Sequence, residues 1–490
     1  MLNLSKINTS TRFLMKSLTI LLVISILFPI RHVFLTNQAY LSGQYSDFTS
    51  FSLYLSDILI FALFGLVLVI RPRQLYHVAR PVPKAEGPYL DAQKSLNDEE
   101  IDKFYGLKAF WCGVKSLKWL ILVLFLAFIV HFTVQTRLSL YLLLRWLELI
   151  VAYGTLVVIF KEFDLKALIL KLFACLSGLE ALLALTQFAK QSSLGLFKIG
   201  EQHISPTILG VAKIVSSGTT YIRGYGTFPH PNPLSAVLVA GIFTTLYLLI
   251  SSISLKAKIT YSFLLFLSIL GLTVTFSRGA YLALAAGLII FFGMYNVIAR
   301  SASDEAISPN KKIASAALAM TTILVSIIIS FAVFRPFLLT RATFSDQSTM
   351  ARKFYDVTGV KMAIQNPIFG VGLGESMLHM EQYSGKVLAP WDKQPPHNYF
   401  IIAAAELGIP AALILLWIFL SQLWMLVKKI RLEKNPEQGT YYLLLTTILI
   451  SFLLLMQFDH YFYTLEQTQL LLWFVLALIT AEIKNPQIGD

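Results

Sequence analysis

Long apolar blocks constrain the fold of this chain more than any other feature of its sequence. We place twelve of them, at residues 14–34, 51–70, 117–134, 138–160, 167–188, 233–253, 260–276, 279–298, 313–334, 398–426, 440–457 and 467–483. Most are close to the length of about 20 residues with which a helix crosses a bilayer. The sequence therefore predicts an all-α, polytopic integral membrane protein with about 12 transmembrane helices, forming a single membrane domain over residues 1–490.

The composition excludes other classes of protein. Apolar residues make up 56% of the chain and charged residues only 14%, against about 25% charged residues in ordinary globular chains. Too little polar surface remains for a soluble enzyme or a disordered chain. Cys112 and Cys175 lie near or inside apolar runs, and they offer neither metal-ligand spacing nor a disulfide framework.

The net charge of +13 has two possible explanations, nucleic-acid binding or the basic ends of membrane spans. Lysine and arginine cluster at the ends of the apolar blocks, where anionic headgroups and the positive-inside bias favour them. No aromatic and basic motif accompanies the charge. We therefore expect the lipid bilayer, and no nucleic acid, as a partner.

The distribution of lysine and arginine also predicts an orientation. Short connections on the side of the N-terminus carry the excess, so both termini are expected in the cytoplasm. The first block has a basic lead and lacks a clear cleavage site, which indicates an uncleaved anchor. Residues 71–116 then form a cytoplasmic loop, and residues 189–231 and 335–396 form extracytoplasmic loops, the last between the ninth and tenth helices.

Two of these loops contain local patterns. The acidic run 98–102 in the cytoplasmic loop could hold a metal, although a solvated loop explains it better. In the last loop, apolar residues recur at helical spacing, which predicts a short amphipathic helix on the surface of the bundle or of the membrane. They are Met350, Phe354, Val357, Val360 and Ile364.

Basic and polar residues converge on the predicted outer face. The seventh block ends at Arg278 and the tenth begins at His397, so both lie at the same boundary of the membrane. The flanking loops add further candidates, which are Arg223, His230, Asn232, Arg341, Arg352 and Asn398.

This combination predicts chemistry on a phosphorylated substrate. Helices are predicted to begin at Gly279 and His397, and helix N-termini together with arginines bind phosphate. Histidine is suited to accept a proton near neutral pH. Because the outer face has no supply of ATP or nucleotide sugars, the expected donor is a lipid-linked diphosphate.

Each candidate also has a purely structural explanation. Arg278 could anchor two helices, Arg352 could pair with Asp356 four residues later, and His397 could simply start a helix. His230 could stiffen a proline-rich turn. Glu406 is an intramembrane carboxylate, which is functional by default but could instead hold the bundle together.

Two further patterns have mainly structural explanations. Arg145 and Glu148 are three residues apart in one block and could neutralise each other. Gly370, Gly372 and Gly374 form a GxGxG pattern that indicates a tight turn rather than a dinucleotide site.

The motifs resemble those of the O-antigen ligase and O-antigen polymerase superfamily of polytopic membrane glycosyltransferases. The resemblance covers roughly residues 220–410 and rests on the order, spacing and shared outer location of the motifs. These are Gly226-Thr-Phe-Pro-His-Pro-Asn-Pro233, Thr275-Phe-Ser-Arg-Gly-Ala280, Arg352, Asn366-Pro-Ile-Phe-Gly-Val-Gly-Leu-Gly374, His397-Asn398 and Glu406-Leu-Gly408.

The resemblance implies a function and a set of catalytic residues. Arg278 and Arg352 would hold the diphosphate of an undecaprenyl-linked glycan, and His397 would activate or orient the acceptor hydroxyl. The reaction would be a glycosyl transfer without metal or cofactor, at the outer face of the cytoplasmic (inner) membrane, in the synthesis of a surface polysaccharide of the cell envelope. The acceptor would be a glycan, lipid or protein, and the motifs do not separate ligase from polymerase.

The remaining polar residues of the outer face are candidates for substrate binding. They are Arg223, His230, Asn232, Arg341, Asn398 and Glu406.

A transporter is the main alternative to a transferase. Twelve spans with both ends in the cytoplasm also fit a major facilitator. In that fold, however, the long loop usually lies inside, between the sixth and seventh spans, where this chain has only a short connection around Lys256 and Lys258. A scaffold protein would have no use for the outer arginines and histidines.

Overall fold

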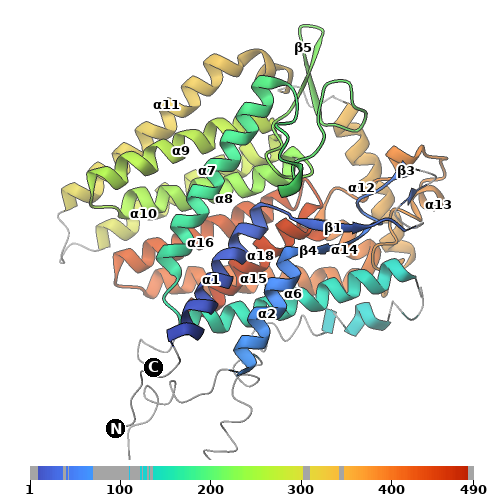
Figure 1. Ribbon diagram of the computed structural model, residues 1–490, viewed down its shortest axis with the longest axis horizontal. Helices are drawn as coiled ribbons and strands as arrows, with labels where there is room; N and C mark the ends of the chain where they lie inside the picture. Colours follow the sequence, from blue (N-terminus) through green and yellow to red (C-terminus); the bar gives the residue numbers. More distant parts are fainter. Residues whose placement is uncertain are drawn as a thin grey trace, which may run out of the picture.

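The computed structural model describes residues 9–36, 40–41, 44–69, 110, 122–123, 125–129, 132, 136–301, 309–341 and 347–483. Within these ranges, nine helices are long and apolar enough to cross a membrane. They are α1 (Thr9–Leu27), α6 (Arg137–Glu162), α7 (Lys166–Lys190), α8 (Pro231–Ser251), α9 (Leu255–Thr275), α10 (Arg278–Ser301), α11 (Pro309–Arg341), α15 (Ile409–Leu432) and α16 (Pro436–Leu455). The structure thus agrees with a polytopic, predominantly helical membrane protein (Figure 1).

Two of the other predicted blocks form shorter helices. Helix α2 (Leu55–Val69) has 15 residues, and α18 (Glu466–Ile483) has 18 residues. Most of the predicted third block, 117–134, and of the loop 71–116 with its acidic run lies outside the described residues.

Helix α8 forms the centre of the bundle (Figure 1). From Pro231 to Ile250 every one of its side chains is buried, as expected for a helix that is apolar on all sides. It packs against α7, α9 and α16. The hydroxyls of Thr244 and Thr245 donate to the carbonyls four residues earlier, so no polar group of these two side chains is left without a hydrogen bond in the apolar interior.

The first predicted block, 14–34, is shorter as a helix than expected. Helix α1 ends at Leu27, and Arg31–Phe34 form strand β1, which pairs antiparallel with β4 (Phe51–Tyr54) so that Arg31 faces Tyr54. Pro29 follows the end of the helix, and a proline there cannot continue the helical hydrogen bonds. The apolar pattern alone did not separate the helix from the strand.

Two more short hairpins depart from the predicted all-α class. Strands β2 (Tyr40–Leu41) and β3 (Gln44–Tyr45) form one, and β5 (Lys213–Ser216) and β6 (Thr219–Ile222) form the other. Between β5 and β6, Ser217 and Gly218 both have positive φ, 49° and 78°, as the two-residue hairpin turn requires.

The predicted tenth span, 398–426, is not one continuous helix, and that prediction was wrong. It is broken into α14 (Tyr399–Leu407) and α15, with Gly408 between them at φ +89°. A β-carbon on Gly408 would lie 2.1 Å from the carbonyl oxygen of Ile368, so only glycine fits here. Helix α15 then begins at Ile409, with Pro410 in its first turn.

The glycine-rich segment fills this break. The N–H groups of Val371 and Gly372 donate to the carbonyls of Ala405 and Glu406, at 2.8 and 3.1 Å. The Glu406 carboxylate accepts from the Gly374 N–H and from the Ser376 hydroxyl, at 2.8 and 2.7 Å. Backbone groups that a continuous helix would pair are therefore satisfied by the loop.

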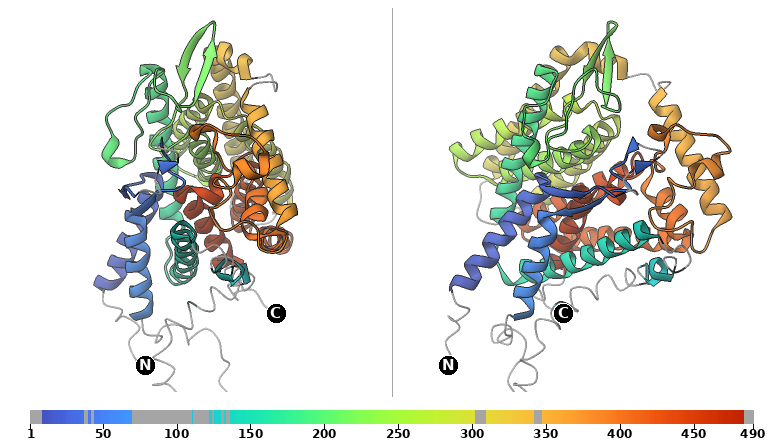
Figure 2. Two further views of the ribbon diagram at one scale, coloured as in Figure 1. Left: turned by 90° about the vertical axis from the view of Figure 1, so that its right-hand side faces the viewer. Right: turned by 45° about the vertical axis from the view of Figure 1, so that its right-hand side comes forward.

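The amphipathic helix predicted in the last loop is α12 (Gln347–Gln365). Its residues Met350, Val357, Val360 and Ile364 are exposed, while Tyr355 and Met362 pack inward. Short helices α13 (Met380–Ser384) and α17 (Tyr461–Thr464) and 3₁₀ turns at Phe197–Ile199 and Pro390–Asp392 complete the fold. Figure 2 shows α12 and the β5–β6 hairpin on the side of the bundle opposite the start of α1.

Candidate active site

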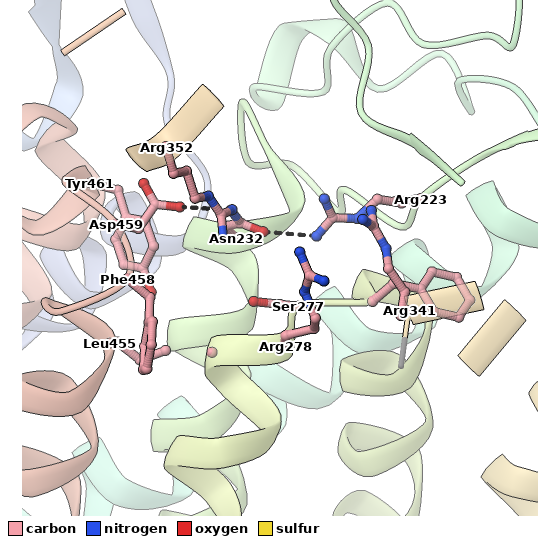
Figure 3. A pocket seen from close by; sticks show the side chains of 12 residues that line it. Arg223, Asn232, Ser277, Arg278, Arg341, Arg352, Leu455, Phe458, Asp459 and Tyr461 are labelled. Carbon is pink, nitrogen blue, oxygen red and sulfur yellow. Dashed lines mark hydrogen bonds and ion pairs between the residues drawn. The ribbon is translucent and has the colours of Figure 1, made fainter. Parts of the chain in front are cut away.

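A pocket lies where the ends of several helices meet. The C-termini of α9, α11 and α16 and the N-termini of α8 and α10 contribute to it, and α12 adds Arg352 (Figure 3). Its lining residues are Arg223, Asn232, Phe276, Ser277, Arg278, Gly279, Arg341, Arg352, Leu455, Phe458, Asp459 and Tyr461. The structure thus brings together all four arginines that the sequence analysis singled out on the predicted outer face.

Arg278 owes its position to the tight turn between α9 and α10. Phe276 ends α9 in the left-handed conformation, with φ 47°, which is costly for a residue other than glycine. The ring of Phe276 packs against Phe188 and Phe337. Helix α10 starts two residues later, with Arg278 as its first residue. The guanidinium of Arg278 donates to the hydroxyl of Thr349 at 3.0 Å, and this hydrogen bond links α10 to the start of α12.

Arg223 is the most deeply buried arginine of the pocket, with only 6% of its surface exposed. Its Nε donates to the carbonyl of Thr275 at 2.6 Å, and one of its terminal nitrogens donates to Asn232 Oδ1 at 2.8 Å. Burial lowers the pKa of Arg223 to about 9, and the charges of Arg341 and Arg352 act in the same direction. The guanidinium therefore still carries its charge at pH 7.

Arg341 ends helix α11. A terminal nitrogen of its guanidinium lies 3.4 Å from the carbonyl of Lys213 at the start of β5. The residue therefore connects the pocket to the β5–β6 hairpin above it.

Helix α12 presents three residues to the site at helical spacing. A terminal nitrogen of Arg352 lies 4.0 Å from Asp459 Oδ2. The ring of Tyr355 stacks on His397 with 5.4 Å between centroids, and Asp356 Oδ1 accepts the backbone N–H of His397 at 2.6 Å. The carboxylate of Asp356 is thus engaged with His397, which favours a role for Arg352 in the pocket over a simple pair with Asp356.

His397 is not among the residues that line the pocket, but it lies beside Asp459, which does line it. Its ring contacts that of His460 edge to face, with 5.0 Å between centroids. Burial lowers the pKa of His397; Asp459 opposes this effect and Arg352 reinforces it. The imidazole is therefore neutral at pH 7, as a proton acceptor must be.

The sequence analysis missed Asp459 and His460. The backbone N–H of Tyr399 donates to the carbonyl of Met456 at 2.9 Å, and this contact brings the chain after α16 beside His397. Burial raises the pKa of Asp459, but His460, His397 and Arg352 outweigh it, so the pKa lies well below its usual range. The available signal was a carboxylate next to a histidine, directly after the eleventh apolar block.

Among the residues that the structure describes, His397, Asp459 and His460 form the group that could hold a metal ion. One ligand atom from each of His397, Asp459 and His460 lies within 4.8 Å of the others. The guanidinium of Arg352 is 4.0 Å from the same Asp459 carboxylate, and its positive charge would oppose a cation there.

The other three predicted site residues lie outside the pocket lining. His230 Nδ1 accepts the Asn232 N–H at 3.2 Å and caps α8. Asn398 Oδ1 accepts the N–H groups of Phe400 and Ile401 and caps α14. Glu406 holds the glycine-rich segment. The observed contacts of these three side chains are therefore structural.

A second buried cluster of charges surrounds Arg145. Its guanidinium contacts Glu148 at 2.7 Å, as the sequence spacing suggested, and also Asp57 at 2.8 Å and Glu466. The cluster joins α2, α6 and α18, and its residues do not line the pocket.

Part of the chain matches a known protein family, and the match includes residues of the pocket. Residues 263–416 match the family model described as O-antigen ligase. The match runs from the middle of α9 to the first part of α15 and includes Arg278, Arg341, Arg352 and His397. No curated protein matches the chain.

This match confirms the resemblance found in the sequence. It supports the assignment of the chain to an O-antigen ligase/polymerase-like family of membrane proteins, which transfer glycans. Arg223, Asn232 and Asp459 lie outside the matched residues. They are joined to the site by the fold alone.

Proposed function

We propose that this protein is a glycosyltransferase of the O-antigen ligase/polymerase type, which moves a glycan from undecaprenyl diphosphate to an acceptor hydroxyl at the outer face of the cytoplasmic membrane. The observation that carries the proposal is the gathering of four arginines around one pocket, beside a carboxylate and a histidine. The family match supports the transfer of a glycan in a membrane.

The arginines would bind the diphosphate of the donor. Arg352 of α12 lies on the side of Asp459, and Arg278 of α10 lies across from it with Arg223 and Arg341 (Figure 3). Guanidinium groups bind phosphate oxygens in pairs, and the N-terminus of α10 adds its partial positive charge. This fixed positive charge would stabilise the leaving diphosphate, a task that a metal ion performs in other transferases, so we expect the reaction to be metal-independent.

His397 would act as the general base. The acceptor oxygen attacks the anomeric carbon, the bond from that carbon to the phosphate oxygen breaks, and undecaprenyl diphosphate leaves. The proton of the acceptor hydroxyl passes to the neutral imidazole. The ionised carboxylate of Asp459, with an oxygen within 4.8 Å of a His397 ring nitrogen, would then stabilise the imidazolium.

The location of the pocket favours a transferase over a transporter. The pocket lies at the ends of α8, α9, α10, α11 and α16, whereas transporters bind their substrates near the middle of the membrane. An interfacial pocket suits a donor whose lipid tail stays in the bilayer and whose head group is in water.

The direct test is a transfer assay with purified protein in lipid nanodiscs. We expect the protein to release undecaprenyl diphosphate from a labelled lipid-diphosphate glycan and to transfer the label to an acceptor glycan or lipid, also in the presence of EDTA. Loss of transfer in EDTA that returns with a divalent cation would contradict metal independence. Movement of the intact donor across liposomes without cleavage would favour the transporter.

A further inference from the structure

We propose that Asn232 is a positioning residue, which holds the carboxylate of Asp459 away from Arg352 and so leaves that guanidinium available to the diphosphate. This proposal rests on the proposed function and deepens it. Asn232 lies between two groups of pocket residues, Arg223 on one side and Asp459 with Arg352 on the other (Figure 3).

Both ends of the Asn232 amide are occupied. Its Oδ1 accepts from Arg223 at 2.8 Å, and its Nδ2 donates to Asp459 Oδ2 at 2.7 Å. A guanidinium can only donate and an ionised carboxylate can only accept, so these partners fix the orientation of the amide. A side chain with only acceptors or only donors could not make both bonds.

Asn232 is itself held rigidly. It is 5% exposed and lies in the first turn of α8 between Pro231 and Pro233, which limit the backbone. Its N–H donates to His230 Nδ1, and its carbonyl accepts from the Ser235 hydroxyl at 2.6 Å. The position of the amide is therefore fixed, and both of its partners are bonded to it.

Asp459 is the partner that most needs a fixed position. Its Oδ1 accepts the His460 backbone N–H at 2.9 Å, and its Oδ2 is the oxygen that accepts from Asn232. That same Oδ2 lies 4.0 Å from Arg352, beyond the length of a good ionic hydrogen bond. Without the hydrogen bond from Asn232, the Asp459 carboxylate would pair with the Arg352 guanidinium, because a buried charge that lacks a hydrogen-bond partner is costly.

This step predicts a specific defect. In Asn232→Ala, Arg352 would be engaged by Asp459 and would compete poorly for phosphate. The apparent KM for the lipid-diphosphate donor should then rise about 10- to 100-fold, the range expected for one hydrogen bond to a charged group. A smaller fall in kcat should accompany it.

The test combines Asn232→Ala and Asp459→Asn in a double-mutant cycle, with steady-state transfer kinetics. If Asn232 acts through Asp459, removal of the Asp459 charge should cancel most of the rise in donor KM, and the two effects should not add. Independent, additive effects on KM would overturn the proposal.

Two further variants keep the test decisive. Asn232→Asp has nearly the same shape and retains an acceptor for Arg223 but cannot donate to Asp459, so it should show the KM defect even if Asn232→Ala does not fold. Thr244→Ala removes a buried hydroxyl from α8 whose hydrogen bond goes to the carbonyl of Ala240, away from the pocket, and it should leave the donor KM within about twofold, as expected for a neutral hydrogen bond remote from the amide. A normal KM in Asn232→Asp would contradict the proposal. Absence of transfer by the unmodified protein would instead refute the proposed function.

Discussion

Asp356 and His397 are joined through the backbone, since the Asp356 carboxylate accepts the His397 N–H at 2.6 Å. This bond connects α12, which carries Arg352, to the residue that precedes the cap of α14. Together with the stacking of Tyr355 on His397, this carboxylate fixes the position of the histidine that we assign to the acceptor relative to the helix that carries Arg352.

Removal of that acceptor should loosen the arrangement. Asp356→Ala should lower kcat by about 10- to 100-fold, the range for a lost hydrogen bond to a charged group, while Asp356→Asn keeps an acceptor oxygen and should lose less. Transfer kinetics of the two variants provide the measurement. Equal losses would show that the charge of Asp356, not its hydrogen bond to His397, is what matters.

His397→Ala should lose the chemical step rather than donor binding. Loss of a general base costs about 100- to 10,000-fold in rate, whereas the arginines that bind the diphosphate remain in place. Asn398→Ala is the neighbouring control: it removes a helix cap, which costs about 1 kcal/mol of stability, and it should reduce transfer far less. The measurements are transfer rate and donor affinity side by side. Near-normal transfer by His397→Ala, or lost donor binding without a separate rate defect, would rule out the assignment as base.

Arg278→Lys and Arg352→Lys should each lose most of their activity while the protein still inserts into the membrane. A lysine keeps the positive charge but cannot bind phosphate with two parallel hydrogen bonds. Lys353→Ala is a matched control, because Lys353 is the exposed neighbour of Arg352 on α12. Full activity of Arg352→Lys would indicate that Arg352 only anchors the helix.

The pH dependence of transfer should follow the pKa of His397. Since this pKa is lowered from 6.5, the rate should stay high down to below pH 6.5 and fall only as the imidazole takes up a proton. The Asp459 carboxylate raises that pKa and Arg352 lowers it, so Asp459→Asn should shift the acidic limb to lower pH and Arg352→Gln should shift it to higher pH. The pH–rate profiles of the activity that remains in the two variants test both directions. Shifts of the opposite sign would show that another group determines the pH at which the rate falls.

The same shift has a consequence for stability. The folded protein binds this proton less readily than the unfolded chain does. The contribution of His397 to stability is therefore fully present above about pH 6.5, the pKa of the unfolded chain. It is lost as the pH falls from there through the lower pKa of the folded protein.

The orientation in the membrane can be tested with single cysteines in a background without Cys112 and Cys175. Val387 is 96% exposed in the loop 335–396, and Lys434 is exposed in the connection between α15 and α16. An impermeant reagent added outside intact cells should label Val387→Cys and not Lys434→Cys. The reverse pattern would place the pocket on the cytoplasmic side and would remove the basis for a donor at the outer face.

The sequence by itself determined the features that depend on neighbouring residues. The apolar length of α8 required a buried membrane helix, the spacing in 350–364 predicted α12, and the pattern around Arg278 placed that residue at the junction of two helices. These inferences succeed because helix formation in lipid depends on local hydrophobicity and on backbone hydrogen bonds within one segment.

The tertiary structure alone decided which side chains share the pocket and what each one contacts. Asn232 meets Asp459 from 227 positions away in the chain, and Glu406 turns out to hold a loop rather than to line the pocket. The break at Gly408 also depends on distant backbone, since Ile368 approaches that glycine closely and the Val371 N–H pairs with the carbonyl of Ala405. Such contacts depend on how the helices pack and cross, and a pattern of hydrophobic residues does not specify the angle or rotation of one helix against another.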